Sequence, residues 1–264
     1  INALVGRRDL CPVGVEVTSS TAVSVTVDSA LDVDEAAELF FPSGTQRHVE
    51  VGELAQWVTT DGEQVLDPQV DELPTSAAIA IRTARVADVT LVDTPGVGGL
   101  DVGLAKLASQ SAQQACVLVL VCDASSPLTA PEMAFVREAS STVDSVVVVV
   151  TKTDKNLRKW REIVAEDERL ISREIGRPFP VFGVSSLLAS IAAELPDTAE
   201  SERLEQESGI ATLRAELSRR LDAAADLPEA DAVRTSLEGL KVVRGKISRA
   251  VSYTHLTLPT KRIV

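Results

Sequence analysis

The chain has 264 residues, is 45% hydrophobic and carries a formal net charge of −13 at pH 7. This length and composition are sufficient for one hydrophobic core, and the acidity argues against a nucleic-acid partner, because a polyanion is repelled by a negative surface. Three cysteines at irregular spacing form neither a disulfide framework nor a metal site, which predicts a cytoplasmic protein. The longest uncharged apolar run, residues 115–122, is too short to cross a bilayer.

Both ends of the chain are unusual. Ile1–Gly6 has the pattern of a helix interior, without an initiator Met or a capping residue, so we expect that sequence preceding Ile1 is missing. Val251–Val264 changes abruptly in composition, carries the single tyrosine, Tyr253, and looks like translated sequencing-adapter read-through. We therefore exclude this last segment from the fold prediction.

The first half of the chain predicts an alternation of strands and short helices. A Ser/Thr-rich loop over residues 10–21 leads into an alternating strand at Val23–Val27. The later predicted elements are a helix at Asp34–Phe40, a strand at Arg47–Val51, a helix at Glu53–Val58 with Trp57 on its apolar side, and a strand at Ala77–Ala84.

An apolar strand that starts at Asp88 ends in Asp93-Thr94-Pro95-Gly96. A buried strand of this kind delivers a carboxylate to its C-terminal edge, where open α/β sheets bind ligands. In phosphate-binding proteins, such an aspartate holds Mg²⁺ through a water, and the backbone N–H of the following glycine approaches a γ-phosphate. Asp93 and Gly96 are therefore candidate metal and nucleotide ligands.

The second half of the chain alternates strongly between strand and helix, as βαβ units do. Cys116 and Cys122 are expected to be small core residues, and Asp123 to tie down a turn. The predicted elements are a helix at Val102–Gln114, a strand at Cys116–Asp123, a helix at Pro131–Ala139, a strand at Ser145–Val150, a helix at Asn156–Gly176, a strand at Phe179–Val184 and a long helical pattern from Ser201 through Ala225.

Two further strand ends carry polar motifs. Ser145–Val150 leads into Thr151-Lys152-Thr153-Asp154, and Phe179–Val184 leads into Ser185-Ser186. A carboxylate at Asp154 accepts hydrogen bonds from both the ring N–H and the exocyclic amine of guanine, whereas adenine presents an acceptor at the ring nitrogen. The methylenes of Lys152 are suited to cover the base plane.

These three strand ends resemble those of P-loop GTPases. The resemblance implies an α/β fold with a mostly parallel sheet flanked by helices, GTP and Mg²⁺ as ligands, Asp93 and Gly96 in the magnesium and γ-phosphate motif, and Thr151, Lys152, Asp154, Ser185 and Ser186 around guanine. It also places the phosphate-binding loop immediately upstream of Ile1, so residues 1–264 alone are expected to be inactive. Thr21 matches the switch threonine that binds Mg²⁺ and supports catalysis, and Thr18 remains open as its alternative.

Thr21 and Asp93 lie 72 positions apart, which is more than a minimal GTPase needs. Three features resemble bacterial dynamin-like proteins of the actinobacterial type. They are this enlarged switch region, the amino-acid sequence of residues 10–23 and 93–100, and Thr151 in place of the usual Asn. Val97 cannot orient a water, so the attacking water must be positioned by other groups. The resemblance implies GTP hydrolysis coupled to membrane remodelling, a homodimer through G domains, and peripheral lipid contact at the inner face of the cell membrane.

The same resemblance predicts a G domain over residues 1–225, the start of a helical neck over residues 226–250 and a non-native tail over residues 251–264. The neck is indicated by a narrow apolar stripe from Val233 to Val251. Two alternatives stay open: a small ribosome- or RNA-associated GTPase, and a G-domain scaffold that does not hydrolyse nucleotide.

Overall fold

The structure is a computed structural model that describes residues 1–13, 21–31, 35–86, 88–93, 115–143 and 145–225. The chain divides into two units, Ile1–Arg220 and Leu221–Val264, and the elements below belong almost entirely to the first. Several predicted features lie outside the described residues: Thr18, Gly96, Val97, the Val102–Gln114 helix and everything from residue 226 onward, including the Val233–Val251 stripe and the tail.

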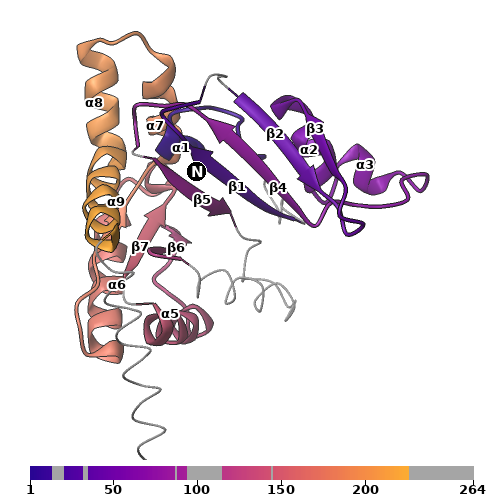
Figure 1. The fold of residues 1–264 in the computed structure, drawn as a ribbon. Helices are drawn as coiled ribbons and strands as arrows, with labels where there is room; N and C mark the ends of the chain where they lie inside the picture. Colours follow the sequence, from indigo (N-terminus) through magenta and orange to yellow (C-terminus); the bar gives the residue numbers. More distant parts are fainter. Residues whose placement is uncertain (14–20, 32–34, 87, 94–114, 144, 226–264) are drawn as a thin grey trace, which may run out of the picture. The chain divides into compact units, whose positions relative to one another are not determined.

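A five-stranded mixed sheet with the order β3-β2-β4-β1-β5 forms the first layer (Figure 1). Strand β1 (Ala22–Val27) pairs in parallel with β4 (Ser76–Ile81) and antiparallel with β5 (Val89–Asp93). Strand β2 (Glu35–Phe40) pairs antiparallel with both β4 and β3 (Gln46–Val49). The order places β1 beside β5, so the start of β1 lies next to the end of β5, which carries Asp93.

The core of this sheet follows the period-two alternation of the strands. Val23, Val25 and Val27 of β1 are buried, as are the alternating apolar residues of β4. The helical segments η1 (Val51–Glu53), α2 (Leu54–Val58) and α3 (Glu63–Leu66) follow β3. The ring of Trp57 on α2 meets Phe41 edge to face at 6.0 Å between centroids, which confirms the prediction that Trp57 packs into the core.

The predicted helix at Asp34–Phe40 is wrong, because residues 35–40 form strand β2. The sequence Glu-Ala-Ala-Glu-Leu-Phe is rich in strong helix formers, and its propensity favours a helix. In the folded chain, however, hydrogen bonding to β3 and β4 on both sides holds it extended, and Ala37, Leu39 and Phe41 alternate into the core. The tertiary context overrides the local preference at this position.

A three-stranded parallel sheet with the order β6-β7-β8 follows in the second half of the chain (Figure 1). Its strands are β6 (Leu118–Asp123), β7 (Val146–Thr151) and β8 (Val181–Gly183). The five consecutive valines of β7 are all buried, as expected of a central parallel strand covered on both faces. The α/β class predicted from the sequence is confirmed by these two sheets and their helices.

Helices cover both faces of the second sheet. Val146 and Val148 pack in one cluster with α5 (Ala130–Thr142) and α6 (Trp160–Ile175). Val147 and Val149, which point the other way, pack with α7 (Ser186–Glu194) and α9 (Ile210–Ala225). Among the described helices, none combines the length and apolar character needed to cross a bilayer.

The C-terminal helical pattern consists of two helices rather than one. Helix α8 (Ala199–Ser208) ends at Gly209, whose φ of 74° is left-handed, and α9 begins immediately afterwards. The spacing of apolar residues continues across Gly209, so the sequence analysis predicted one helix and not two. Glycine is nevertheless the usual residue at such a helix end. Helix α7 was not predicted, and α6 begins at Trp160 rather than Asn156 because residues 157–159 form a turn after the short helix η2 (Thr153–Lys155).

The prediction that Cys116 is a core residue is wrong, because it is exposed and precedes β6. Cys122 does lie in β6, partly buried, and its thiol contacts the Val149 carbonyl at 3.6 Å. Burial raises the pKa of the Cys122 thiol to about 12, so this side chain is a neutral core group at physiological pH.

Candidate nucleotide-binding site

The carboxyl ends of β6, β7 and β8 bring three polar loops to one edge of the parallel sheet. The register pairs Asp123 with Thr151 and Val150 with Gly183, so residues 123–125, 151–156 and 183–186 follow adjacent strand ends. In open parallel sheets, ligands bind at this edge. The sequence motifs at Thr151–Asp154 and Ser185-Ser186 therefore meet in space, as predicted.

Asp154 is held by a buried serine. The Ser185 hydroxyl donates to Asp154 Oδ1 at 2.6 Å and accepts from the Leu188 backbone N–H at 3.1 Å, which makes Ser185 the N-cap of α7. Ser185 is 1% exposed. Because the serine is fixed by its capping bond, it fixes one carboxylate oxygen of Asp154 in turn.

Lys152 adopts a left-handed backbone conformation with φ 58°, which is uncommon for a residue other than glycine. Its Nζ lies 3.3 Å from Asp123 Oδ2, while Asp123 Oδ1 accepts from the Ser125 backbone N–H at 2.9 Å and from the Ser125 hydroxyl. These Ser125 hydrogen bonds, and then Lys152, hold the pKa of the Asp123 carboxyl below its usual range. The predicted turn at Asp123 is confirmed, and it also anchors Lys152.

The other two predicted base-site residues differ in their surroundings. The Thr151 hydroxyl donates to the Cys122 carbonyl at 2.9 Å, so it ties β7 to β6. Ser186 is exposed in the first turn of α7. Thr151 therefore supports the strand ends structurally, whereas the polar groups form two separate pairs, Lys152 with Asp123 and Asp154 with Ser185.

Several supporting residues were not found from the sequence. Asn156 donates to the Ala124 carbonyl at 2.7 Å, and this bond closes the loop after β7 onto the end of β6. The backbone N–H of Ser185 donates to the Ser208 carbonyl at 2.8 Å, just before Gly209. The ring of Trp160 lies so close to Gly183 that a Cβ on this glycine would be 2.4 Å from it. Of these features, only Gly183 and Gly209 carry a residue type that could have indicated a close backbone approach, and the sequence analysis did not use it.

A second group of predicted residues lies at the end of β5. Asp93 is partly buried and pairs in register with Val23. Burial raises the pKa of the Asp93 carboxyl. Burial also raises the pKa of the Cys11 thiol to about 11, and the negative charge of Asp93 acts in the same direction. Ile1, which directly precedes α1 (Asn2–Val5), lies near Asp93 and Cys11.

Thr21 is 8% exposed, and its hydroxyl donates to the Pro74 carbonyl at 3.3 Å. A hydroxyl that donates in this way keeps its lone pairs, so it can still coordinate a cation. Among the described residues, no Lys or Arg forms an ion pair with Asp93, and no cluster of three or more His, Cys, Asp and Glu side chains is present.

The comparison with protein families decides the classification. The family model described as "Dynamin family" matches residues 1–153. The chain belongs to the dynamin family. The resemblance to bacterial dynamin-like proteins inferred from the sequence motifs is therefore confirmed for a G domain.

Curated relatives of this dynamin-family chain are bacterial. The Isoniazid-induced protein IniA of Mycobacterium tuberculosis is 40% identical over 109 residues, which are 41% of this chain and 17% of IniA. The uncharacterized protein in the xynA 3′ region of a Caldicellulosiruptor species is 23% identical over 206 residues, covering 78% of this chain and 49% of that protein. The chain thus spans between about a sixth and a half of these relatives.

Solved structures of an oligomerised bacterial dynamin pair share the fold. That pair is described as providing a mechanism for the long-range sensing and tethering of membranes. One of its chains matches with a TM-score of 0.58 and 14% identity, over 85% of this dynamin-family chain and 32% of its own length. The other matches with a TM-score of 0.59 and 16% identity, over 97% and 48% respectively.

Proposed function

We propose that the protein binds and hydrolyses GTP, and that residues 1–264 supply the guanine-reading part of its G domain. The observation that supports this most directly is the Ser185–Asp154 hydrogen bond of 2.6 Å at the carboxyl edge of the parallel sheet. A carboxylate with one oxygen fixed is preorganised to accept from the N–H groups of guanine, and preorganised acceptors discriminate strongly against a base that offers none. Lys152, two residues before Asp154 in the same loop, is held by Asp123.

Asp93 and Thr21 fit the role of magnesium ligands. A hydroxyl and a carboxylate are the oxygen donors that Mg²⁺ prefers. The carboxyl group of Asp93 is partly buried and burial raises its pKa, so a bound cation would relieve the cost of its negative charge. The ion would neutralise phosphate charge during transfer. The role of this chain would be to position the two oxygen ligands, Asp93 at the end of β5 and Thr21 directly before β1.

The sharpest test of base recognition is Asp154→Asn in the longer protein that includes the sequence preceding Ile1. We expect preference to shift from guanosine toward xanthosine nucleotides by about 1–3 kcal/mol, since one hydrogen bond is inverted. Asp197→Asn, at an exposed position, is the matched control. Unchanged guanine preference in a competition assay would remove Asp154 from the site.

For residues 1–264 alone, we propose neither tight nucleotide binding nor turnover. The phosphate contacts that carry much of the affinity belong to a loop that the family places before Ile1. Mg²⁺-dependent GTPase activity of residues 1–264, at a rate comparable to the longer protein, would contradict this.

We further propose that residues 1–225 act as a G domain that pairs with a second copy, followed by a helical neck from residue 226, in a cytoplasmic protein that contacts the inner face of the membrane peripherally. Support comes from the solved relatives, which are an oligomerised dynamin pair described as sensing and tethering membranes. The test is turnover per molecule across protein concentration, with and without anionic liposomes. A rate independent of both would refute self-association and lipid coupling while leaving GTP hydrolysis intact.

A further inference from the structure

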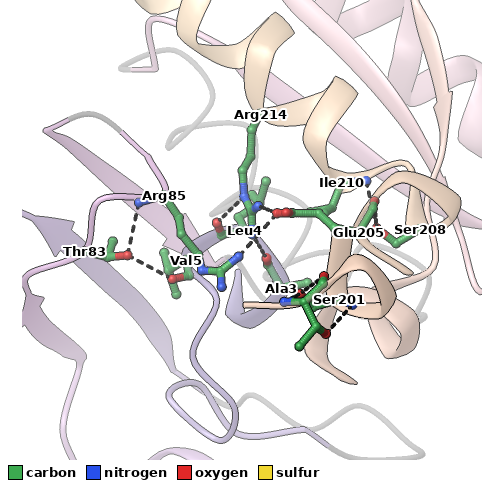
Figure 2. Close-up of polar contacts among 11 residues, drawn as sticks. Ala3, Leu4, Val5, Thr83, Arg85, Ser201, Glu205, Ser208, Ile210 and Arg214 are labelled. Carbon is green, nitrogen blue, oxygen red and sulfur yellow. Dashed lines mark hydrogen bonds and ion pairs between the residues drawn. The ribbon is translucent and has the colours of Figure 1, made fainter. Parts of the chain in front are cut away.

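Every backbone carbonyl of the short helix α1 has a hydrogen-bond partner, and two of the partners come from one distant side chain. Arg214 Nη2 donates to the Ala3 carbonyl at 2.7 Å, and Arg214 Nε donates to the Leu4 carbonyl at 2.8 Å (Figure 2). The Thr83 hydroxyl donates to the Val5 carbonyl at 3.2 Å. The Asn2 carbonyl accepts from the Gly6 backbone N–H. Arg214 on α9 therefore satisfies carbonyls that a helix C-terminus otherwise leaves to solvent.

Arg214 is held in this position by an acidic partner. Its side chain is 11% exposed, and Nη1 bonds the Glu205 carboxylate on α8. The same Glu205 oxygen accepts from Arg85 Nη1 at 3.3 Å (Figure 2). Burial lowers the pKa of the Arg214 guanidinium, with Glu205 opposing the shift, and an arginine remains charged under these conditions. The two arginines thus share one carboxylate between α8, α9 and the segment after β4.

The packing leaves little room for α1 to move independently. Ala3 belongs to the cluster that contains Val147, Ile210 and Leu213, whereas Val5 belongs to the core of the five-stranded sheet. At Gly6, an added Cβ would lie 2.2 Å from Arg85 Cδ. Helix α1 therefore contacts both cores, and Arg214 fixes the polar side of its C-terminal end.

We propose that Arg214 is a positioning residue for phosphate binding, acting through α1 on the segment that directly precedes it. This inference rests on the proposed function, in which the phosphate-binding loop leads into α1. The planar guanidinium donates to two successive carbonyls and to a carboxylate at once, whereas a lysine ammonium is a point charge that cannot reproduce this geometry. Loss of the bonds loosens the C-terminal end of α1 and misplaces backbone groups at its start.

The test compares Arg214→Lys and Arg214→Gln with Arg219→Gln in the longer protein. Arg219 is on the same helix, pairs with Glu216 one turn away and is exposed, so it controls for loss of a charge on α9. We expect both Arg214 variants to bind GTP about tenfold more weakly, as loss of charged hydrogen bonds predicts, while Arg219→Gln binds as the wild type. Amide exchange at residues 2–7 should accelerate only in the Arg214 variants.

Competition with guanosine separates positioning from general destabilisation. Guanosine has no phosphates, so the Arg214 variants should retain its affinity, whereas a merely unfolded or loosened domain loses GTP and guanosine equally. Unchanged GTP affinity in folded Arg214 variants, or an equal loss for both ligands, overturns the inference. If Arg214→Gln does not fold, Arg214→Lys and Thr83→Val decide it; the latter removes the bond to the Val5 carbonyl and the bond that the Thr83 hydroxyl accepts from the Arg85 backbone N–H. A wild-type protein that binds no GTP would instead refute the proposed function itself.

Discussion

Substitution of Gly209 by alanine should destabilise the domain through two separable effects. Gly209 ends α8 with φ 74°, a conformation that costs an L-residue about 1–2 kcal/mol. An added Cβ would also lie 2.4 Å from the Gly183 carbonyl oxygen, whereas ordinary contact begins at 3.4 Å, so the two backbones must separate by about 1 Å. Forcing extra volume into such a contact costs about 1–3 kcal/mol more. We therefore expect a total loss of about 2–5 kcal/mol.

Gly176→Ala is the matched control for this prediction. Gly176 ends α6 with φ 75°, and a Cβ there would have no heavy atom within 4 Å, so this variant measures the backbone cost alone. Urea unfolding of residues 1–264, followed by circular dichroism, gives the two free energies. Gly209→Ala should be the less stable variant by about 1–3 kcal/mol. Equal destabilisation would refute the claim that the Gly183–Gly209 contact is tight.

Three further outcomes follow from buried or paired ionisable groups. Burial raises the pKa of the Asp167 carboxyl above 3.8, so the folded state binds its proton more tightly than the unfolded state does. The free energy of unfolding therefore falls as the pH rises through the folded pKa. Asp167→Asn should flatten this dependence in urea unfolding from pH 3 to 7. Two arginines lower the pKa of the Glu216 carboxyl to about 2. Its contribution to the free energy of unfolding is therefore present above pH 4.5 and is lost as the pH falls toward 2. Glu216→Gln should abolish this pH-dependent loss of stability. Iodoacetamide at pH 8 should modify exposed Cys116 well before Cys122, whose pKa is about 12, and mass spectrometry of the peptides checks the order.

The strands that were predicted correctly from the sequence are those whose own residue pattern is sufficient to specify an extended conformation. Strand β7 is an uninterrupted run of valines, and β1 alternates apolar and polar residues, so either pattern is sufficient without neighbours. Strand β2 lacks such a pattern, because Glu, Ala and Leu favour a helix and only pairing with β3 and β4 makes them a strand. The break at Gly209 escaped prediction for a similar reason, since the pattern of apolar residues continues across it.

Some residues of the candidate site could likewise be predicted from the sequence, and others could not. Lys152, Asp154 and Ser185 directly follow strands, and strand ends can be read along the chain. Their supports depend on contacts between segments far apart in sequence: Ser208 bonds Ser185 from another helix, and Arg214 bonds α1 across 210 positions. An arginine in an amphipathic helix ordinarily indicates a solvated face, so no pattern in the sequence distinguishes Arg214 from exposed arginines of the same helix such as Arg219.

The junction between α8 and α9 supports both predicted halves of the site. At one end of the junction, the Ser208 carbonyl accepts from the backbone of Ser185, whose hydroxyl holds Asp154. At the other, Arg214, whose guanidinium also donates to Glu205, donates to the Ala3 and Leu4 carbonyls of α1, and Ile1 before this helix lies near Asp93. Because one short stretch of chain, residues 205–214, makes both sets of bonds, a displacement of that stretch must disturb the base side and the phosphate side together. This shared support gives a physical reason for the sharp turn at Gly209: a continuous helix would not bring residues 205 and 214 to the same point.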